Sequence, residues 1–165
     1  MGYRDRLEST PETVQELELA AARHLEEAME LFLANRNHTA IYVAGLSAEM
    51  YLKTACYFVG GAAPGDGTDA LFAAARPNPH RYVPPFRADF ESGHVLWFWS
   101  QELMARRQRR QLRMAPNRFI QVSAALYLDW YVAMRYRPGS ATVDEAAQFL
   151  TNVEWLANNH ALLRR

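Results

Sequence analysis

Helical spacing of the apolar residues is the feature that most limits how this chain can fold. Near the N-terminus, apolar side chains recur three and four positions apart, on one side of a helix: Leu17, Ala21, Leu25, Ala28 and Phe32. A capping box from Ser9 to Glu12, with Pro11 in the first turn, favours a helix start there. The sequence therefore predicts a long helix that reaches about Asn35.

A second helix is predicted to begin with Asn37 as its cap and to end at Gly60 and Gly61. Most residues on one of its faces are small, which would let a neighbouring helix approach closely: Ile41, Ala44, Gly45, Ala48, Leu52, Ala55 and Val59. Because only a few residues join the first two helices, we expect them to form an antiparallel hairpin.

Residues 60–92 differ in texture and are rich in proline and glycine. They predict a long irregular connection with room for one short helix over Ala70–Ala75. The glycines do not form a phosphate-binding loop, because the Gly-Lys-Ser/Thr ending is missing. A connecting segment is the better interpretation.

Three more helices are indicated after this connection. One runs from about Ser92 to Met114, and the next is capped by Asn117 and continues to Pro138 and Gly139. The last opens with a capping box at Thr142–Glu145 and reaches about Asn159. The sequence thus predicts one all-α domain over residues 1–165, an antiparallel helical bundle of four to five helices.

Composition narrows the function only slightly. Half of the residues are hydrophobic, and 18 acidic residues balance 18 Lys and Arg, so net charge gives no argument for a nucleic-acid or membrane partner. Cys56 is the lone cysteine, which excludes an intrachain disulfide and favours a buried, inert thiol. No stretch is apolar enough for a secretory signal or a membrane span, so we expect a cytoplasmic protein.

An isolated pair of opposite charges interrupts the second predicted helix. Glu49 and Lys53, the only lysine in the chain, lie one helical turn apart in the favourable order for an ion pair. On a solvated surface such a pair would contribute only a few tenths of a kcal/mol, at roughly 0.2–0.5. The apolar context of YVAGLSAEMYLKTA argues against that simple interpretation.

This stretch resembles the signature of the HEPN domain family, whose second helix carries an alanine-rich run, a Glu, an apolar pair and a Lys. Glu49 and Lys53 match that signature. The segment SGHVL at 92–96 is similar to the family's Gly-His-Asp-Leu helix start, with Val95 in place of Asp. Arg135 and Tyr136 resemble its Arg-Tyr-x-Pro ending, and the acidic opening DEAA at 144–147 is similar to its last helix. The resemblance spans roughly residues 15–160.

The resemblance implies a small all-helical bundle that is commonly a homodimer and acts on or near RNA or nucleotides. It also implies a prokaryotic toxin–antitoxin or defence-type system, in which a nucleotidyltransferase would be a natural protein partner. Many members are ribonucleases that use an Arg and a His with four to six residues between them. In this sequence Arg87 and His94 have that spacing, in RADFESGH.

A metal-independent endoribonuclease would need His94 to move a proton and Arg87 to stabilise charge on the phosphate. However, Ala88 replaces the polar residue that usually follows the Arg, and about one or two such pairs are expected by chance in a chain of this composition. His94 as a helix-start or packing residue is the competing interpretation. We therefore predict a non-catalytic module that binds RNA, a nucleotide or a partner protein, with the endoribonuclease as the alternative.

Five arginines close together form the second candidate site: Arg106, Arg107, Arg109, Arg110 and Arg113. If the helix continues, residues 106, 109, 110 and 113 share one face and would contact several phosphates. Cations also favour helix C-termini through the helix dipole, which gives a purely structural alternative. The aromatic residues at 97–99 and 130–131 are expected in the core or in a dimer interface.

Metal and cofactor chemistry is not indicated. The spacing Glu-x-x-His occurs once, at Glu91 and His94, whereas a di-iron bundle needs it twice together with two more carboxylates. There is no His-Glu-x-x-His and no Gly-x-Ser-x-Gly. We predict no metal and no cofactor.

Overall fold

The computed structural model describes residues 12–75, 96–113, 115–130, 134 and 139–165. Within these ranges it has six helices, no strands and one isolated antiparallel bridge between Thr13 and Gly67. The helices are α2 (Val14–Leu33), α3 (Asn37–Gly60), α4 (Thr68–Ala75), α5 (Leu96–Arg109), α6 (Asn117–Asp129) and α7 (Val143–Leu163). The predicted all-α helical bundle is confirmed.

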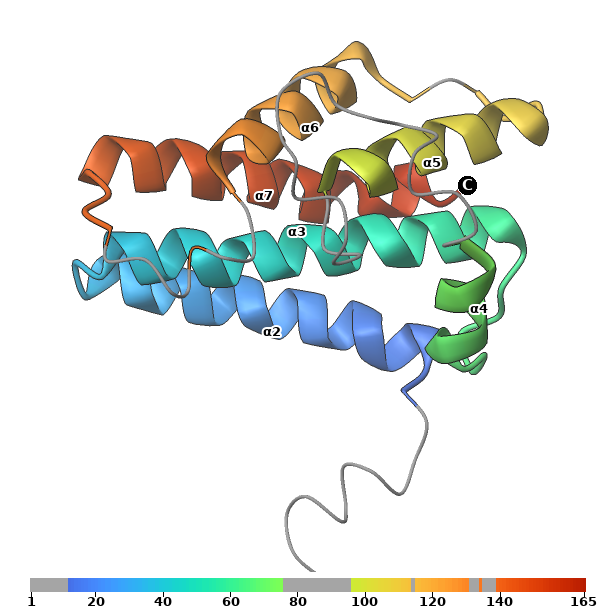
Figure 1. The fold of residues 1–165 in the computed structure, drawn as a ribbon, viewed down its shortest axis with the longest axis horizontal. Helices are drawn as coiled ribbons and strands as arrows, with labels where there is room; N and C mark the ends of the chain where they lie inside the picture. Colours follow the sequence, from blue (N-terminus) through green and yellow to red (C-terminus); the bar gives the residue numbers. More distant parts are fainter. Residues whose placement is uncertain (1–11, 76–95, 114, 131–133, 135–138) are drawn as a thin grey trace, which may run out of the picture.

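The first two long helices form the predicted antiparallel hairpin (Figure 1). Asn35 adopts a left-handed conformation with φ 59° and closes α2, because its N–H donates to the Phe32 carbonyl and that of Arg36 donates to Leu31. Small residues let the two helices approach closely. The buried Ser47 hydroxyl donates a 2.7 Å hydrogen bond to the Ala21 carbonyl across the interface.

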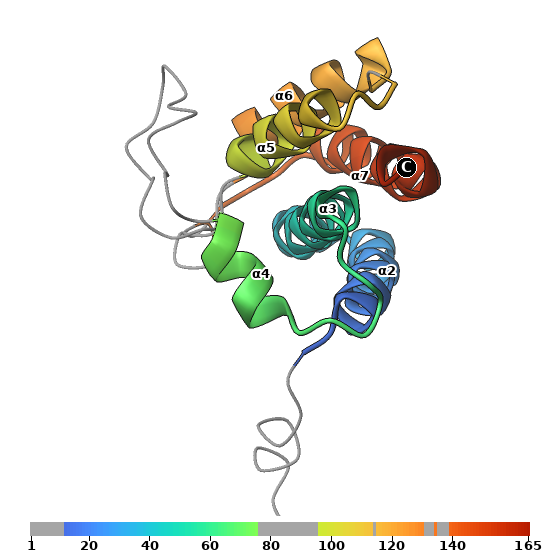
Figure 2. The same cartoon turned by 90° about the vertical axis from the view of Figure 1, so that its right-hand side faces the viewer.

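Helix α3 lies at the centre of the bundle (Figure 2). It packs against α2, α5 and α7, which explains why its sequence is apolar or small on nearly every side. The core between these helices and α6 is closed by large buried side chains: Leu52, Trp99, Leu103, Phe119, Leu126, Trp130, Phe149 and Leu156.

Helix α2 begins one turn later than the sequence suggested. Its capping box joins Thr13 and Glu16, and the predicted box of Ser9 with Glu12 falls partly outside the described residues because Ser9 is not among them. The N–H groups of Val14 and Gln15 donate to the carbonyls of residues 66 and 64. This long-range pairing satisfies donors that a helix start leaves unpaired, so the loop before α4 helps to fix where α2 begins.

Two other predicted helix ends are wrong. Helix α5 ends at Arg109 and not at Met114, because Gln111 has φ 56° and the Leu112 N–H turns back to the Arg107 carbonyl. Helix α6 ends at Asp129 and not near Pro138, since Trp130 is extended. The indole Nε1 of Trp130 then donates to the Tyr42 carbonyl at 3.0 Å.

The remaining boundaries are closer to expectation. Gly61 is left-handed, with φ 98°, and ends α3 as predicted, and the capping box at Thr142 and Glu145 opens α7. Helix α7 continues to Leu163, one turn beyond the prediction. Asn37 is the first residue of α3 and not its cap, and its amide donates to the Ala141 carbonyl at 3.1 Å.

Asn117 likewise is the first residue of α6, after Pro116 as the cap. The short helix of the connection is present as α4, and residues 61–67 before it are irregular as predicted. Residues 76–92 of the predicted connection lie outside the described residues. Among the described helices, none is both long and apolar enough to cross a bilayer.

Candidate functional site

Three helices end close together at one end of the bundle. Figure 1 shows the last turns of α3, α5 and α7 at the right-hand side of the molecule. Each helix end carries carbonyl groups without partners inside the helix and the negative pole of a helix dipole. The arginine run of α5 lies at this convergence, so its local surroundings are rich in acceptors.

Arg107 is the buried member of the run, with 3% of its surface exposed. Its Nη1 donates to the carbonyls of Leu163 at 2.5 Å and Arg165 at 2.7 Å, at the end of α7. Its Nε and Nη2 donate to the Arg113 carbonyl at 3.1 and 2.6 Å. Burial lowers the pKa of this guanidinium. Arg107 therefore joins the ends of α5 and α7 and is not part of an outer surface.

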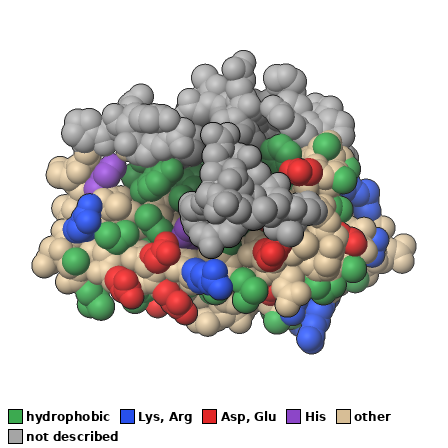
Figure 3. Space-filling view, turned by 90° about the horizontal axis from the view of Figure 1, so that it is seen from below, with side chains coloured by type: hydrophobic (Ala, Val, Ile, Leu, Met, Phe, Trp, Pro, Cys, Tyr) green, Lys and Arg blue, Asp and Glu red, His purple; other side chains and the backbone are tan. Residues whose placement is uncertain are grey.

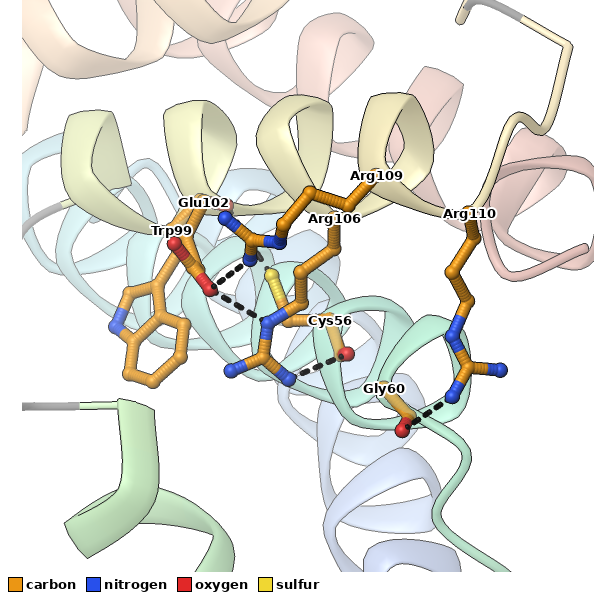
Figure 4. Close-up of polar contacts among 7 residues, drawn as sticks. All are labelled: Cys56, Gly60, Trp99, Glu102, Arg106, Arg109 and Arg110. Carbon is orange, nitrogen blue, oxygen red and sulfur yellow. Dashed lines mark hydrogen bonds and ion pairs between the residues drawn. The ribbon is translucent and has the colours of Figure 1, made fainter.

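Arg106 is bound to α3 and to an acid on its own helix (Figure 4). Its Nε donates to Glu102 Oε1 at 2.6 Å, and its Nη1 donates to the Cys56 carbonyl at 3.0 Å. The same Glu102 oxygen accepts a 3.1 Å bond from Arg109 Nη2. Glu102 is only 7% exposed, so it neutralises part of the run from inside.

Arg109, Arg110 and Arg113 are the exposed members of the run. Half of the Arg109 side chain, 49%, remains accessible although it pairs with Glu102. Arg110 donates from Nη2 to the Gly60 carbonyl at 2.8 Å at the end of α3. Arg113 follows the left-handed turn at Gln111, so the predicted helical stripe that included it is wrong. These three residues, which we call the arginine end, are what remains of the predicted nucleic-acid surface.

The Glu49–Lys53 pair is buried, and a solvated surface pair is therefore the wrong interpretation. Lys53 Nζ forms an ion pair with Glu49 Oε1, and the two side chains are 14% and 4% exposed. The ammonium also lies 5.1 Å from the Phe72 ring centroid on α4 and 5.4 Å from the Trp99 ring on α5. Aromatic rings attract a cation through their quadrupoles, so α4 and α5 together stabilise the only lysine.

Four of the predicted site residues, Arg87, His94, Arg135 and Tyr136, lie outside the described residues. Their positions relative to the arginine end and to the Glu49–Lys53 pair are therefore not described. Among the residues that the structure does describe, no three His, Cys, Asp or Glu side chains converge in a way that would hold a metal ion.

Sequence reasoning missed one partly buried polar cluster, where α2, α3 and α7 meet. It joins Glu18, Thr54, His160 and Arg164 through hydrogen bonds and ion pairs. Glu18 and Arg164 are separated by 146 positions in the chain. The signal in the sequence was a Glu and a His within otherwise apolar helix faces, which indicates burial but not partners.

Compared with known protein families, curated proteins and solved structures, the chain has no match in any of the three. The class of protein that the fold and these clusters define is an all-α helical bundle with a cationic end.

Proposed function

We propose that this chain is a non-catalytic HEPN-like helical module that binds RNA through the arginine end, within a cytoplasmic prokaryotic toxin–antitoxin or defence-type system. One observation carries the choice of RNA. Arg106 and Arg107 are used inside the protein, yet Arg109, Arg110 and Arg113 remain exposed at the same end. Three clustered guanidinium groups would contact successive phosphates without reading sequence.

The charge distribution of α2 also favours RNA binding at the arginine end. Five Glu and one Arg lie within Val14–Leu33, so this helix is acidic. Figure 3, seen from below, shows Asp and Glu side chains spread over this face, with Lys and Arg side chains at its left edge and centre as well as at its right-hand edge. A polyanion would be repelled by α2 and attracted to the arginine end, which limits how it would approach.

The HEPN-like part of the proposal is supported by the α2–α3 hairpin and by the position of the Glu49–Lys53 pair. Both matched positions point inward, where they tie α3 to α4 and α5. A signature pair with this placement would stabilise the packing of the helices and would not contact a ligand. Binding of RNA would therefore depend on other residues, which favours the arginine end.

The test is RNA binding by fluorescence anisotropy over a series of salt concentrations. We expect the triple variant Arg109→Gln/Arg110→Gln/Arg113→Gln to bind more weakly. Its slope of log affinity against log salt should fall by about 2, because each lost phosphate contact on a single strand removes about 0.7. The matched control is Arg23→Gln/Arg36→Gln/Arg118→Gln, which removes three arginines elsewhere on the molecule. Equal losses in the two triples would contradict the proposal.

Binding of a nucleotide or of a partner protein in place of RNA is a distinct outcome of this experiment. If RNA does not bind the parent at low salt, nucleoside phosphates and a co-expressed nucleotidyltransferase are the next ligands to measure. The family resemblance also implies a homodimer, and sedimentation equilibrium of the purified chain would measure its mass directly.

Cleavage is tested separately from binding. The parent, Arg87→Ala and His94→Ala would be incubated with structured RNA in EDTA. We expect intact RNA in all three reactions. Metal-independent cleavage by the parent that both variants lose would instead establish the alternative, an endoribonuclease using Arg87 and His94.

A further inference from the structure

An array of polar groups with a buried centre connects three helices and makes no contact with the proposed RNA surface. His160 of α7 is 4% exposed, and its Nδ1 lies 3.1 Å from Glu18 Oε1 of α2. Its other nitrogen, Nε2, lies 2.9 Å from the hydroxyl of Thr54, a fully buried residue of α3. One imidazole ring thus bridges the two helices of the hairpin to the last helix.

The hydrogen bonds fix which tautomer the neutral ring adopts. Glu18 Oε1 accepts, so the proton of the neutral ring lies on Nδ1, and Nε2 accepts from the Thr54 hydroxyl. That hydroxyl has alternative acceptors, the carbonyls of Met50 at 3.0 Å and Tyr51 at 3.1 Å. If Nε2 gains a proton, it donates to Thr54 Oγ1, and the hydroxyl turns to one of these carbonyls. Thr54 therefore satisfies either protonation state of Nε2, and any preference between the two states comes from the burial of the ring and the charges around it.

The charges around the ring make the two states unequal. Arg164 Nη1 donates to both Glu18 oxygens, at 2.9 and 3.0 Å, so an imidazolium would share one carboxylate with an existing cation. The phenol of Tyr51 from α3 lies beside the ring, with centroids 5.2 Å apart, and its pKa is raised by burial and by Glu18 and Glu26 of α2. Within the described structure, the charged groups of α2, α3 and α7 that face the ring include one acid in direct contact with it, Glu18.

Burial is the main cause that lowers the pKa of His160, Arg164 adds to it, and Glu18 opposes both. A histidine with a lowered pKa in the folded state stabilises the fold while it is neutral. Its contribution is complete above the ordinary pKa of about 6.5 and is lost as the pH falls below that value.

We propose that Glu18, His160 and Thr54 form an acid-sensitive latch that holds the end of α7 on the α2–α3 hairpin. Protonation of His160 puts two cations on one carboxylate, and the last turns of α7 separate from α2. The same turns supply the carbonyls of Leu163 and Arg165 that bind Arg107. Opening the latch therefore also loosens the arginine end, because Arg107 in turn binds the Arg113 carbonyl.

Hydrogen exchange measured between pH 7.5 and 5.0 tests the latch. Protection factors correct for the intrinsic effect of pH on exchange, so any remaining change reports on the structure. For amides 156–163 of the parent we expect protection to fall below pH 6.5, by at most about tenfold per pH unit because one proton is involved. The His160→Gln variant should show no such dependence, because glutamine does not titrate.

His24→Gln is the matched control, since His24 on α2 is a partly exposed histidine that pairs with Glu27 at 2.8 Å. It should keep the pH dependence of the parent. A fall in protection that persists in His160→Gln would overturn the latch. If His160→Gln does not fold, NMR titration of the parent decides: a His160 ring that titrates at or above pH 6.5, or a parent whose protection is constant with pH, would equally overturn it.

Discussion

The indole ring of Trp130 lies across Gly45, at the middle of α3. A Cβ atom added to Gly45 would be 1.9 Å from Trp130 Nε1, far inside van der Waals contact. Trp130 is 2% exposed and its Nε1 is bonded to the Tyr42 carbonyl, so the ring has little freedom to move away. This contact places Trp130, the residue that follows α6, directly against the central helix.

We predict that Gly45→Ala destabilises the protein by about 1–3 kcal/mol, the usual cost of overpacking a filled core. The added methyl group displaces the indole and breaks its bond to Tyr42. Urea unfolding should show a lower midpoint with an unchanged slope. Gly65→Ala is the control, because no atom lies within 4 Å of a Cβ at that position. Equal midpoints for the two variants would contradict the close packing of Trp130 on α3.

Arg107→Lys should lower stability by about 2–3 kcal/mol, although the charge is kept. An ammonium has no planar fork, so it would leave buried carbonyls at the ends of α5 and α7 without donors. Thermal unfolding monitored by circular dichroism measures the loss. Arg118→Lys is the control, since Arg118 is exposed on α6 and should change the midpoint little. A parent-like midpoint for Arg107→Lys would show that its carbonyl contacts are unimportant.

The helices themselves were predictable because their signals are local. Spacing of apolar residues gave α2 and α3, glycine at position 61 gave the end of α3, and Thr142 with Glu145 gave the start of α7. The segment STPETVQE, however, holds two consecutive capping-box patterns, Ser9–Glu12 and Thr13–Glu16. The structure shows the second pattern at the start of α2. The N–H groups of Val14 and Gln15 donate to carbonyls of the loop before α4, and these long-range hydrogen bonds favour a helix start at that point.

The candidate site was less predictable, for a physical reason. A run of arginines is equally compatible with solvent and with carbonyl groups at helix ends. Whether Arg107 faces solvent or binds carbonyl groups depends on where the end of α7 lies, and that end is more than fifty positions away in the sequence. The left-handed turn at Gln111 also has no clear signal in the sequence, because most left-handed residues are glycines. This turn follows the end of α5 and places Arg113 outside the helix.

The buried ion pair gives a third prediction. Lys53→Met removes the ammonium from the buried Glu49 carboxylate and from two aromatic rings, and should cost about 3 kcal/mol. Replacing both partners, in Glu49→Gln/Lys53→Met, should recover part of this loss because the buried carboxylate that lost its lysine is then replaced by a neutral amide. A double-mutant cycle of urea midpoints measures the coupling. Additive effects of Glu49→Gln and Lys53→Met would mean that the pair contributes nothing.

Cys56 should be unreactive in the folded protein. Its thiol is fully buried and donates to the Trp99 carbonyl at 3.3 Å, and burial raises its pKa, so almost no thiolate exists at neutral pH. Labelling with a thiol-specific reagent should be slow in buffer and complete in denaturant. Rapid labelling of the native protein would place Cys56 at the surface, in conflict with the packing of α3 against α5.

Two threonines on α7 offer a matched test of helix capping. Thr142 Oγ1 accepts from the Glu145 N–H at 3.2 Å, whereas Thr151 donates to the Ala147 carbonyl within the helix. Thr142→Ala should therefore lower the melting temperature by about 2–4 °C, and Thr151→Ala should leave it unchanged or raise it.

The same pair of variants has an expected pH dependence. Hydrogen bonds from the backbone and then the side chain of Thr142 lower the pKa of Glu145 below its ordinary value of 4.5. A carboxyl with a lowered pKa stabilises the fold above its unfolded pKa and loses that contribution as pH falls through the folded value. The difference in melting temperature between Thr142→Ala and the parent should thus shrink in strong acid. A difference that stays constant down to about pH 3, well below the unfolded pKa, would show that the carboxylate takes no part in the cap.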